Sequence, residues 1–149
     1  MKRILVADDG SEAAFTAVEI AAELAAKTGA ELIALAVIDP NRVPAADIIK
    51  VARSEKLGDA EALEILVDAS ADYLRRCEEV AKRDGVNHFR KARRAGTDPA
   101  LEITDFVCAN DIDLVVVGSR GRGRLPGLLL GSTSQRLASQ APCSVLIAR

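Results

Sequence analysis

The sequence predicts a single α/β domain over residues 1–149, with a doubly wound, five-stranded parallel sheet in the order 3-2-1-4-5 and helices on both faces. Three observations predict this fold. Short apolar runs alternate along the chain with longer segments of helical periodicity, which is typical of parallel sheets covered by helices. Two of these runs, Ile4–Ala7 and Leu114–Val117, contain no polar residue, as expected of strands buried on both faces. A chain of 149 residues is long enough for one domain with a sizeable core.

The N-terminal part of the chain predicts two strands with a helix between them. Residues 4–7 form the first strand, which ends in a turn over residues 8–11. Residues 11–27 are rich in alanine and carry apolar side chains at helical spacing, and Gly29 stops this helix. The second strand covers residues 32–38.

The middle of the chain is less regular. Residues 40–57 predict a connection with a short helical turn over residues 46–53, and a connection of this length often has a function, for example as a lid. A second helix follows over residues 59–84. Residues 88–94 predict the third strand, whose basic residues favour an edge position because edge strands tolerate charge.

The C-terminal part predicts two more helices and two more strands. A third helix covers residues 99–109, with Asp98 as its N-cap and a proline in its first position. The fourth strand, residues 114–117, is the most apolar. Residues 131–140 form the fourth helix, and residues 145–148 form the last strand.

Composition and charge argue against several classes of protein. A net charge of −2 disfavours a general nucleic-acid or anionic-membrane surface, and aromatic residues, at 3%, are too few to stack bases. Three widely spaced cysteines fit neither a zinc site nor a disulfide framework, and the single histidine, His88, has no partner for a hydrolase triad. Without a signal peptide or a membrane-length apolar run, we expect a cytoplasmic protein with no nucleic-acid or membrane partner.

A glycine-rich stretch near the C-terminus predicts a phosphate or nucleotide site. The fourth strand runs into Gly118 and Gly121, and Gly131 later opens a helix. Glycine backbone can come close to phosphate oxygens, and the N–H groups at a helix start favour an anion. Ligands of doubly wound sheets bind where the winding reverses, at the carboxyl ends of the strands. In the predicted order, that point brings Asp8 and Asp9 beside Gly118.

Two common phosphate loops do not fit this stretch. A Walker A loop requires Gly-Lys-Ser/Thr, which is absent, and the dinucleotide fingerprint has another spacing and follows the first strand. A turn-rich loop without a ligand is the alternative interpretation. The run of Arg120, Arg122 and Arg124 is interpreted as a basic flap over the phosphates or a solvated loop, in preference to a nucleic-acid surface.

The spacing of these glycines resembles the pattern of ATP-binding members of the universal stress protein family. The residues of the pattern are Gly118, Gly121, Gly131 and Ser132. Residues 115–147 closely resemble the C-terminal half of that family, and residues 4–11 are similar to its opening strand and Asp-Gly-Ser turn. Residues 96–99 are similar to its Gly-x-Pro segment, with one extra residue.

The resemblance implies a site for ATP, with or without Mg²⁺. In this family the residue matching Asp9 lies in the adenosine region, and the residue matching Val37 offers backbone groups to adenine. The glycines line the ribose and phosphate path, and residues 132–134 hold phosphate oxygens. The predicted nucleotide-binding residues are Ala7, Asp8, Asp9, Val37, Val117, Gly118, Arg120, Gly121, Gly131, Ser132, Thr133 and Ser134.

The two aspartates of the first turn leave questions open at this point. Asp8 departs from the small or apolar residue that is usual in the family. Two adjacent carboxylates repel a polyphosphate unless one faces away or a divalent cation intervenes. Asp9 has a second interpretation as a helix cap, because Asp9 and Glu12 have the spacing of a capping box.

A homodimer is expected through the last strand. No helix follows this strand in the sequence to cover its outer edge, and an uncovered apolar edge is a pairing surface. In the resembled family the strand pairs antiparallel with its copy across a two-fold axis. The resemblance therefore implies a symmetric contact through Ser144–Ala148.

These features favour a regulatory, stress-related protein that binds ATP, with no residue assigned to catalysis. No residue stands out as a general base, and a P-loop lysine is missing. The alternative is a slow Mg²⁺-dependent ATPase or nucleotide hydrolase that uses Asp8 or Asp9. A third hypothesis, a chaperone or scaffold with an empty pocket, is disfavoured because the glycine pattern is complete.

Overall fold

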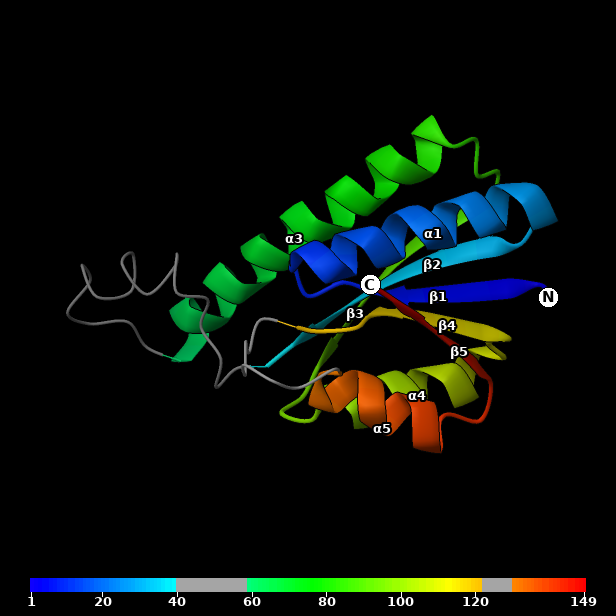
Figure 1. The fold of residues 1–149 in the computed structure, drawn as a ribbon. Coiled ribbons are helices and arrows are strands. Elements are labelled where there is room, and N and C mark those ends of the chain that lie inside the picture. Colours follow the sequence, from blue (N-terminus) through cyan, green and yellow to red (C-terminus); the bar gives the residue numbers. More distant parts are fainter. Residues whose placement is uncertain (40–58, 122–129) are drawn as a thin grey trace.

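The computed structural model describes residues 1–39, 59–121 and 130–149, and of residues 59–69 it describes only the backbone. The predicted connection over residues 40–57, with its helical turn and its role as a lid, lies outside this part of the chain, as do Arg122 and Arg124. Within it, strands and helices follow one another in the predicted order (Figure 1). They are β1 (Arg3–Ala7), α1 (Glu12–Thr28), β2 (Glu31–Ile38), α3 (Asp59–Arg83), β3 (Phe89–Ala95), α4 (Pro99–Asn110), β4 (Leu114–Gly118), α5 (Ser132–Gln140) and β5 (Ser144–Ala148).

The five strands form one parallel sheet in the order β3-β2-β1-β4-β5, which confirms the predicted fold. β1 lies at the centre, and Ala7 at its end pairs with Leu35 of β2 and with Val117 of β4. The carboxyl ends of β1 and β4 therefore lie side by side at the point where the winding reverses. Ligands of such sheets bind at this point.

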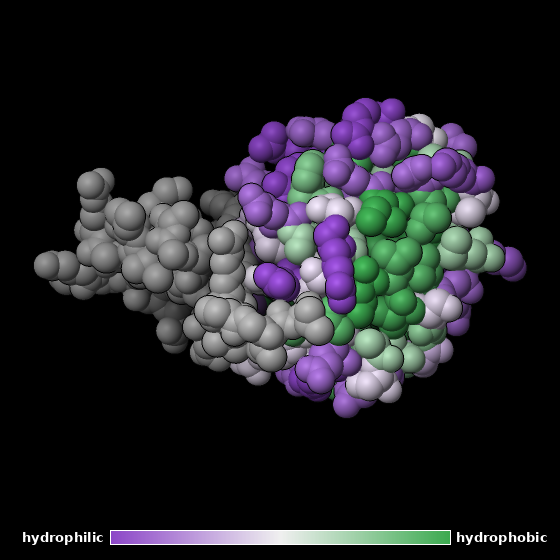
Figure 2. Space-filling view, viewed as in Figure 1, coloured by the Kyte–Doolittle hydropathy of each residue, from purple (hydrophilic) through white to green (hydrophobic). Residues whose placement is uncertain are grey.

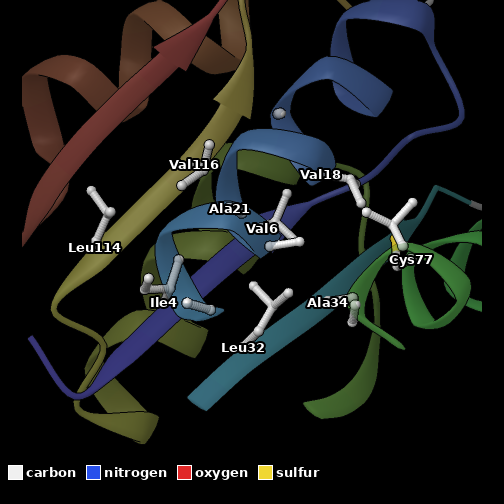
Figure 3. Packing of buried hydrophobic residues seen from close by; sticks show 14 of the residues in the cluster. Ile4, Val6, Val18, Ala21, Leu32, Ala34, Cys77, Leu114 and Val116 are labelled. Atoms are coloured by element: carbon white, nitrogen blue, oxygen red, sulfur yellow. The ribbon is translucent and has the colours of Figure 1, made fainter. Parts of the chain in front are cut away.

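The described helices cover both faces of the sheet, and the alternation of β1 separates the two cores. α1 and α3 lie on one face, and α4 and α5 lie on the other (Figure 1). Ile4 and Val6 point into the cluster under α1 and α3, which Figure 3 shows from close by. Leu5 and Ala7 belong to the cluster on the α4–α5 face. Successive side chains of a strand point to opposite faces, so β1 is buried on both sides.

The ends of α1 confirm one prediction and correct another. Gly29 ends the helix in the left-handed conformation at φ 69°, as predicted. The N-cap, however, is Ser11, whose hydroxyl accepts a hydrogen bond from Ala14 N. The interpretation of Asp9 as the cap is wrong, because its Oδ1 accepts from Ser11 N and so closes a turn one step before the helix.

The predictions for α4 and β3 are confirmed. Asp98 caps α4, and Pro99 occupies the first helical position. β3 is an edge strand, and it tolerates its charges because Lys91 pairs with Glu78 and Arg94 pairs with Glu102. No helix within the described ranges is long and apolar enough to cross a membrane.

Small differences in element boundaries follow from strand pairing. β2 begins one residue earlier than predicted because Glu31 pairs with Arg3 of β1. β4 continues into Gly118, which pairs with Ala148 at the end of β5. The first glycine of the motif is therefore part of the sheet, and the loop begins after it.

Candidate functional site

The turn after β1 and the loop after β4 are in direct contact. A Cβ on Gly118 would lie 2.6 Å from the carbonyl carbon of Ala13, at the start of α1. The Ser11 hydroxyl lies 3.4 Å from the Arg120 carbonyl oxygen and donates to it. Glycine at position 118 thus lets β4 approach the backbone of α1 more closely than any side chain would permit. The predicted juxtaposition of the two segments is present.

Asp9 lies against the glycine loop. A Cβ on Gly121 would be 2.7 Å from Asp9 Oδ2, a separation that real Cβ atoms do not reach. The carboxylate is half-buried, and its other oxygen accepts the hydrogen bond from Ser11 N at 3.0 Å. Glycine at 121 therefore leaves room for a carboxylate beside the loop backbone.

The start of α5 joins the same place. Gly131 N donates to the Ser119 carbonyl oxygen at 2.7 Å, and a Cβ on Gly131 would lie 3.4 Å from Arg120 Cα. Gly131 is also the N-cap of α5 and provides no side-chain hydrogen bond to it. The first N–H groups of a helix have no intrahelical partner, so this end of α5 can donate to an anion.

The three hydroxyl residues after Gly131 differ in their surroundings. Ser134 is buried, and its hydroxyl donates to the Gly118 carbonyl oxygen at 2.6 Å. Ser132 is exposed and Thr133 is half-buried. The Ser134 side chain thus holds the start of α5 to the end of β4, while the other two lie at the surface of the first turn.

Apolar residues form the side of the site that faces α4 and α5. Ala7, Val37 and Val117 all belong to the cluster on this face of the sheet. Val117 is buried, whereas Ala7 and Val37 are half-buried because they lie toward the ends of β1 and β2. A flat apolar group could contact this surface next to the polar turn.

Asp8 lies on the opposite side of the turn, toward α3. Its carboxyl is fully buried, accepts from Gly10 N at 2.8 Å, and accepts from the Cys77 thiol at 3.3 Å. Burial raises the pKa of Asp8 above its ordinary value, although the Gly10 and Cys77 hydrogen bonds and the nearby Arg76 oppose this effect. Burial and the Asp8 carboxyl also raise the pKa of Cys77. Asp8 is thus the one of the two adjacent carboxylates that faces away from the glycine loop.

The α3 partners of Asp8 were missed at the level of sequence. The period of two along β1 contains part of the signal, because it assigns Asp8 to the same face as Ile4 and Val6. Nothing in the local pattern indicates that Arg76 and Cys77, nearly seventy residues later, would meet it there.

The described residues offer little for a metal ion by themselves. Within residues 1–39, 59–121 and 130–149, no group of three or more histidine, cysteine, aspartate or glutamate side chains could hold one. Asp9 is the carboxylate beside the glycine loop. A Mg²⁺ ion would fit here as it does in many nucleotide sites, held mainly by phosphates and by one carboxylate.

Comparisons with known proteins agree with the fold. The family model described as "Universal stress protein family" matches residues 1–149. A universal stress protein of Thermus aquaticus is 32% identical over 152 residues, covering 99% of this chain and 98% of that protein. The structure of universal stress protein UspA from Lactobacillus plantarum is 26% identical with a TM-score of 0.83, covering 99% of this chain and 97% of that one.

A second solved structure was determined with a ligand. It is described as a universal stress protein in complex with cAMP. It is 26% identical to this chain with a TM-score of 0.73, and the match covers 99% of this chain and 97% of that one. The family match extends over the whole chain, and the sheet order agrees with the fold of the similar solved structures. The chain therefore belongs to the universal stress protein family.

Proposed function

We propose that this protein binds an adenine nucleotide, ATP in the first place, and acts as a regulatory sensor in a stress response. The observation that carries the proposal is the convergence of Asp9, Gly121 and Gly131 at the reversal point of the sheet. A carboxylate, a backbone without side chains and an uncapped helix start are the groups that a ribose and a phosphate chain require. The relative solved in complex with cAMP supports an adenine nucleotide as the ligand class.

The proposed contacts divide the site into two parts. Adenine lies against the apolar surface of Ala7 and Val117, and the backbone of Val37 reads its edge. Asp9 contacts the ribose. The phosphates follow the residues that supply backbone N–H groups and hydroxyls along the loop and the start of α5, while Gly118 and Ser134 support this path from the end of β4. The residues along the path are Arg120, Gly121, Gly131, Ser132 and Thr133.

The positions of the Asp8 and Asp9 carboxylates favour nucleotide binding over rapid hydrolysis. Asp8 is buried and hydrogen-bonded on the far side of the turn. Asp9 remains as the carboxylate that could hold Mg²⁺ with the phosphates, and this position favours a slow ATPase as the second candidate function. The second candidate would be established if the protein turns over ATP in the presence of Mg²⁺ and Asp9→Ala abolishes this turnover.

A homodimer through β5 is part of the proposal. β5 is the last strand of the described sheet, and Val145, Leu146 and Ile147 along it remain partly exposed. Figure 2 shows a hydrophobic patch beside the C-terminus, over the region that β5 occupies in Figure 1. Burying such an edge against a second copy removes its unpaired backbone groups from water. Sedimentation at micromolar concentration tests this expectation, and a monomer would contradict it.

The decisive experiment combines identification of the ligand with a change at Gly131. Mass spectrometry of the purified protein should detect a bound adenine nucleotide, and calorimetry should rank ATP, ADP, AMP and cAMP, with GTP as a base control. Gly131→Val places a branched side chain against Arg120 and should lower ATP affinity at least about tenfold. Ala138→Val introduces the same side chain at an exposed position of α5 and should bind ATP like the wild type. Unchanged ATP affinity in Gly131→Val would refute the site.

A further inference from the structure

Asp8 has no role in the proposed ligand contacts, although it is buried next to them. Its carboxyl lies between Gly10, in its own turn, and Cys77, on α3. Figure 3 shows Cys77 on α3 beside Val18 of α1, at the edge of the buried cluster. A carboxyl group inside an apolar cluster is costly unless its oxygens are hydrogen-bonded. Here both oxygens are bonded, and one of the bonds crosses to another element.

Arg76 provides the charge that faces this carboxyl. Its Nη2 lies 3.8 Å from Asp8 Oδ2, and its guanidinium is 4.5 Å from the centre of the Phe15 ring. Nε and Nη2 are buried and find no hydrogen-bond partner among the described residues. A buried donor without a partner is unfavourable, so these atoms depend on the negative charge of Asp8 and on the ring face.

A third contact joins α3 to the same turn. Gly10 has φ 80°, and a Cβ on it would lie 2.5 Å from the ring of Tyr73. Tyr73, Arg76 and Cys77 have the i, i+3, i+4 spacing of one helix face. That face of α3 therefore packs on Asp8 and Gly10, while Asp9 between them lies against Gly121.

We propose that Asp8 is a positioning residue: with Arg76 it holds the β1–α1 turn against α3, and so sets where Asp9 meets the glycine loop. The effect on the ligand rests on the proposed function, but the attachment of the turn to α3 does not. Because coupling is reciprocal, a nucleotide that holds Asp9 also stabilises the contact between α3 and the turn. α3 then becomes the element that responds to occupancy of the site.

The first test needs no nucleotide. The Gly10 amide, which donates to Asp8 Oδ1, should report the titration of this carboxyl in ¹H–¹⁵N spectra, in surroundings that also include Arg76, Cys77 and Asp9. Arg76→Gln should move the midpoint to higher pH, because the nearby cation is lost, and Asp8→Asn should abolish the titration. Arg75→Gln is the matched control, since Arg75 is exposed on the same helix and pairs with Asp72 and Glu79. A Gly10 titration that Arg76→Gln leaves unchanged would overturn the proposal.

The second test measures ATP affinity of the same variants. Asp8→Asn and Arg76→Gln should each weaken ATP binding by about fivefold, and Arg75→Gln should match the wild type. The double variant should bind ATP with no lower affinity than the single variant that binds it less tightly, because both substitutions break the same contact. If Asp8 acted on the phosphates directly, removing its charge would tighten binding, so tighter or unchanged binding by Asp8→Asn refutes the positioning role. A wild type that binds no nucleotide would refute the proposed function, and the attachment of the turn to α3 would still be decided by the Gly10 titration.

Discussion

Asp8 and Asp9 are consecutive in the chain, but their carboxylates lie in two different regions of the molecule. Asp8 is fully buried on the side of α3 and bonded to Gly10 and Cys77. Asp9 is half-buried and lies beside Gly121 on the side of the glycine loop. The alternation of β1 continues into the turn and separates them. One carboxylate therefore serves the fold, and its neighbour lies on the side of the proposed ligand.

The same difference exists between the other residues of the site. Gly118 and Ser134 are packed against backbone and belong to the region that holds the elements together. Gly121 and Ser132 lie in the region that the nucleotide is proposed to follow. A motif read as one unit in sequence thus consists of a structural part and a binding part, and substitutions can separate the two.

The largest expected effect separates two glycines of the motif. In Gly118→Ala the new Cβ meets three backbone atoms of Ala13 and Ala14 at 2.6–2.7 Å, and backbone in a packed helix cannot move aside. We expect a loss of about 3 kcal/mol in the free energy of unfolding, measured in urea. In Gly121→Ala the Cβ meets only the tip of the Asp9 side chain, which can rotate, so the loss should stay below about 1 kcal/mol. Equal losses would remove the distinction between the two glycines.

The next effect concerns Asp9 itself. Asp9→Ala removes the carboxylate beside Gly121 and the hydrogen bond to Ser11 N. ATP affinity measured by calorimetry with Mg²⁺ should fall at least about tenfold, because a charge-assisted contact contributes more than 1 kcal/mol. Chelating Mg²⁺ should weaken ATP binding in the wild type more than in Asp9→Ala, since the carboxylate then repels the phosphates. Wild-type affinity in Asp9→Ala would exclude Asp9 from the site.

Substitutions of two serines of α5 should affect different properties, one the stability of the fold and the other the affinity for ATP. Ser134→Ala removes a buried hydroxyl from the Gly118 carbonyl oxygen and should cost about 1–2 kcal/mol of unfolding free energy. Ser132→Ala changes an exposed side chain and should leave stability within about 0.5 kcal/mol while it weakens ATP binding severalfold. Thermal unfolding and calorimetry on both variants measure this difference. A stability loss in Ser132→Ala comparable to that of Ser134→Ala would contradict it.

The smallest expected effect is the pH dependence that the Asp8 carboxyl gives to the free energy of unfolding. Its pKa is raised in the folded state, so the folded protein binds this proton more tightly than the unfolded chain does. The Asp8 contribution to stability is therefore largest below the ordinary value of 3.8 and declines as the pH rises through the folded pKa. Asp8→Asn lacks this decline, so its stability minus that of the wild type should grow with pH across this window. Urea unfolding of both proteins between pH 4 and 7 measures the difference, and a difference that shrinks with rising pH would contradict a raised pKa of Asp8 in the folded state.

Local signals predicted the fold well because each depends on a few neighbouring residues. Gly29 ends α1, and Asp98 with Pro99 begins α4, as expected from caps that act within one turn. The charges of β3 predicted an edge strand because an edge position tolerates charged side chains. In the structure Lys91 and Arg94 of β3 pair with Glu78 and Glu102. The choice of Ser11 over Asp9 as the cap of α1 was not predictable, because both residue types cap helices and the turn geometry decides between them.

The sequence by itself determined the fold class, the order of elements and the place of the glycine motif at the reversal point of the sheet. These follow from periodicity and from residue types that act locally. Only the tertiary structure decided which of the two aspartates faces α3, that Arg76 and Cys77 meet Asp8, and that the Ser134 hydroxyl binds the end of β4. Such contacts join residues far apart in the chain, and their geometry depends on how the helices pack on the sheet, which no local pattern specifies.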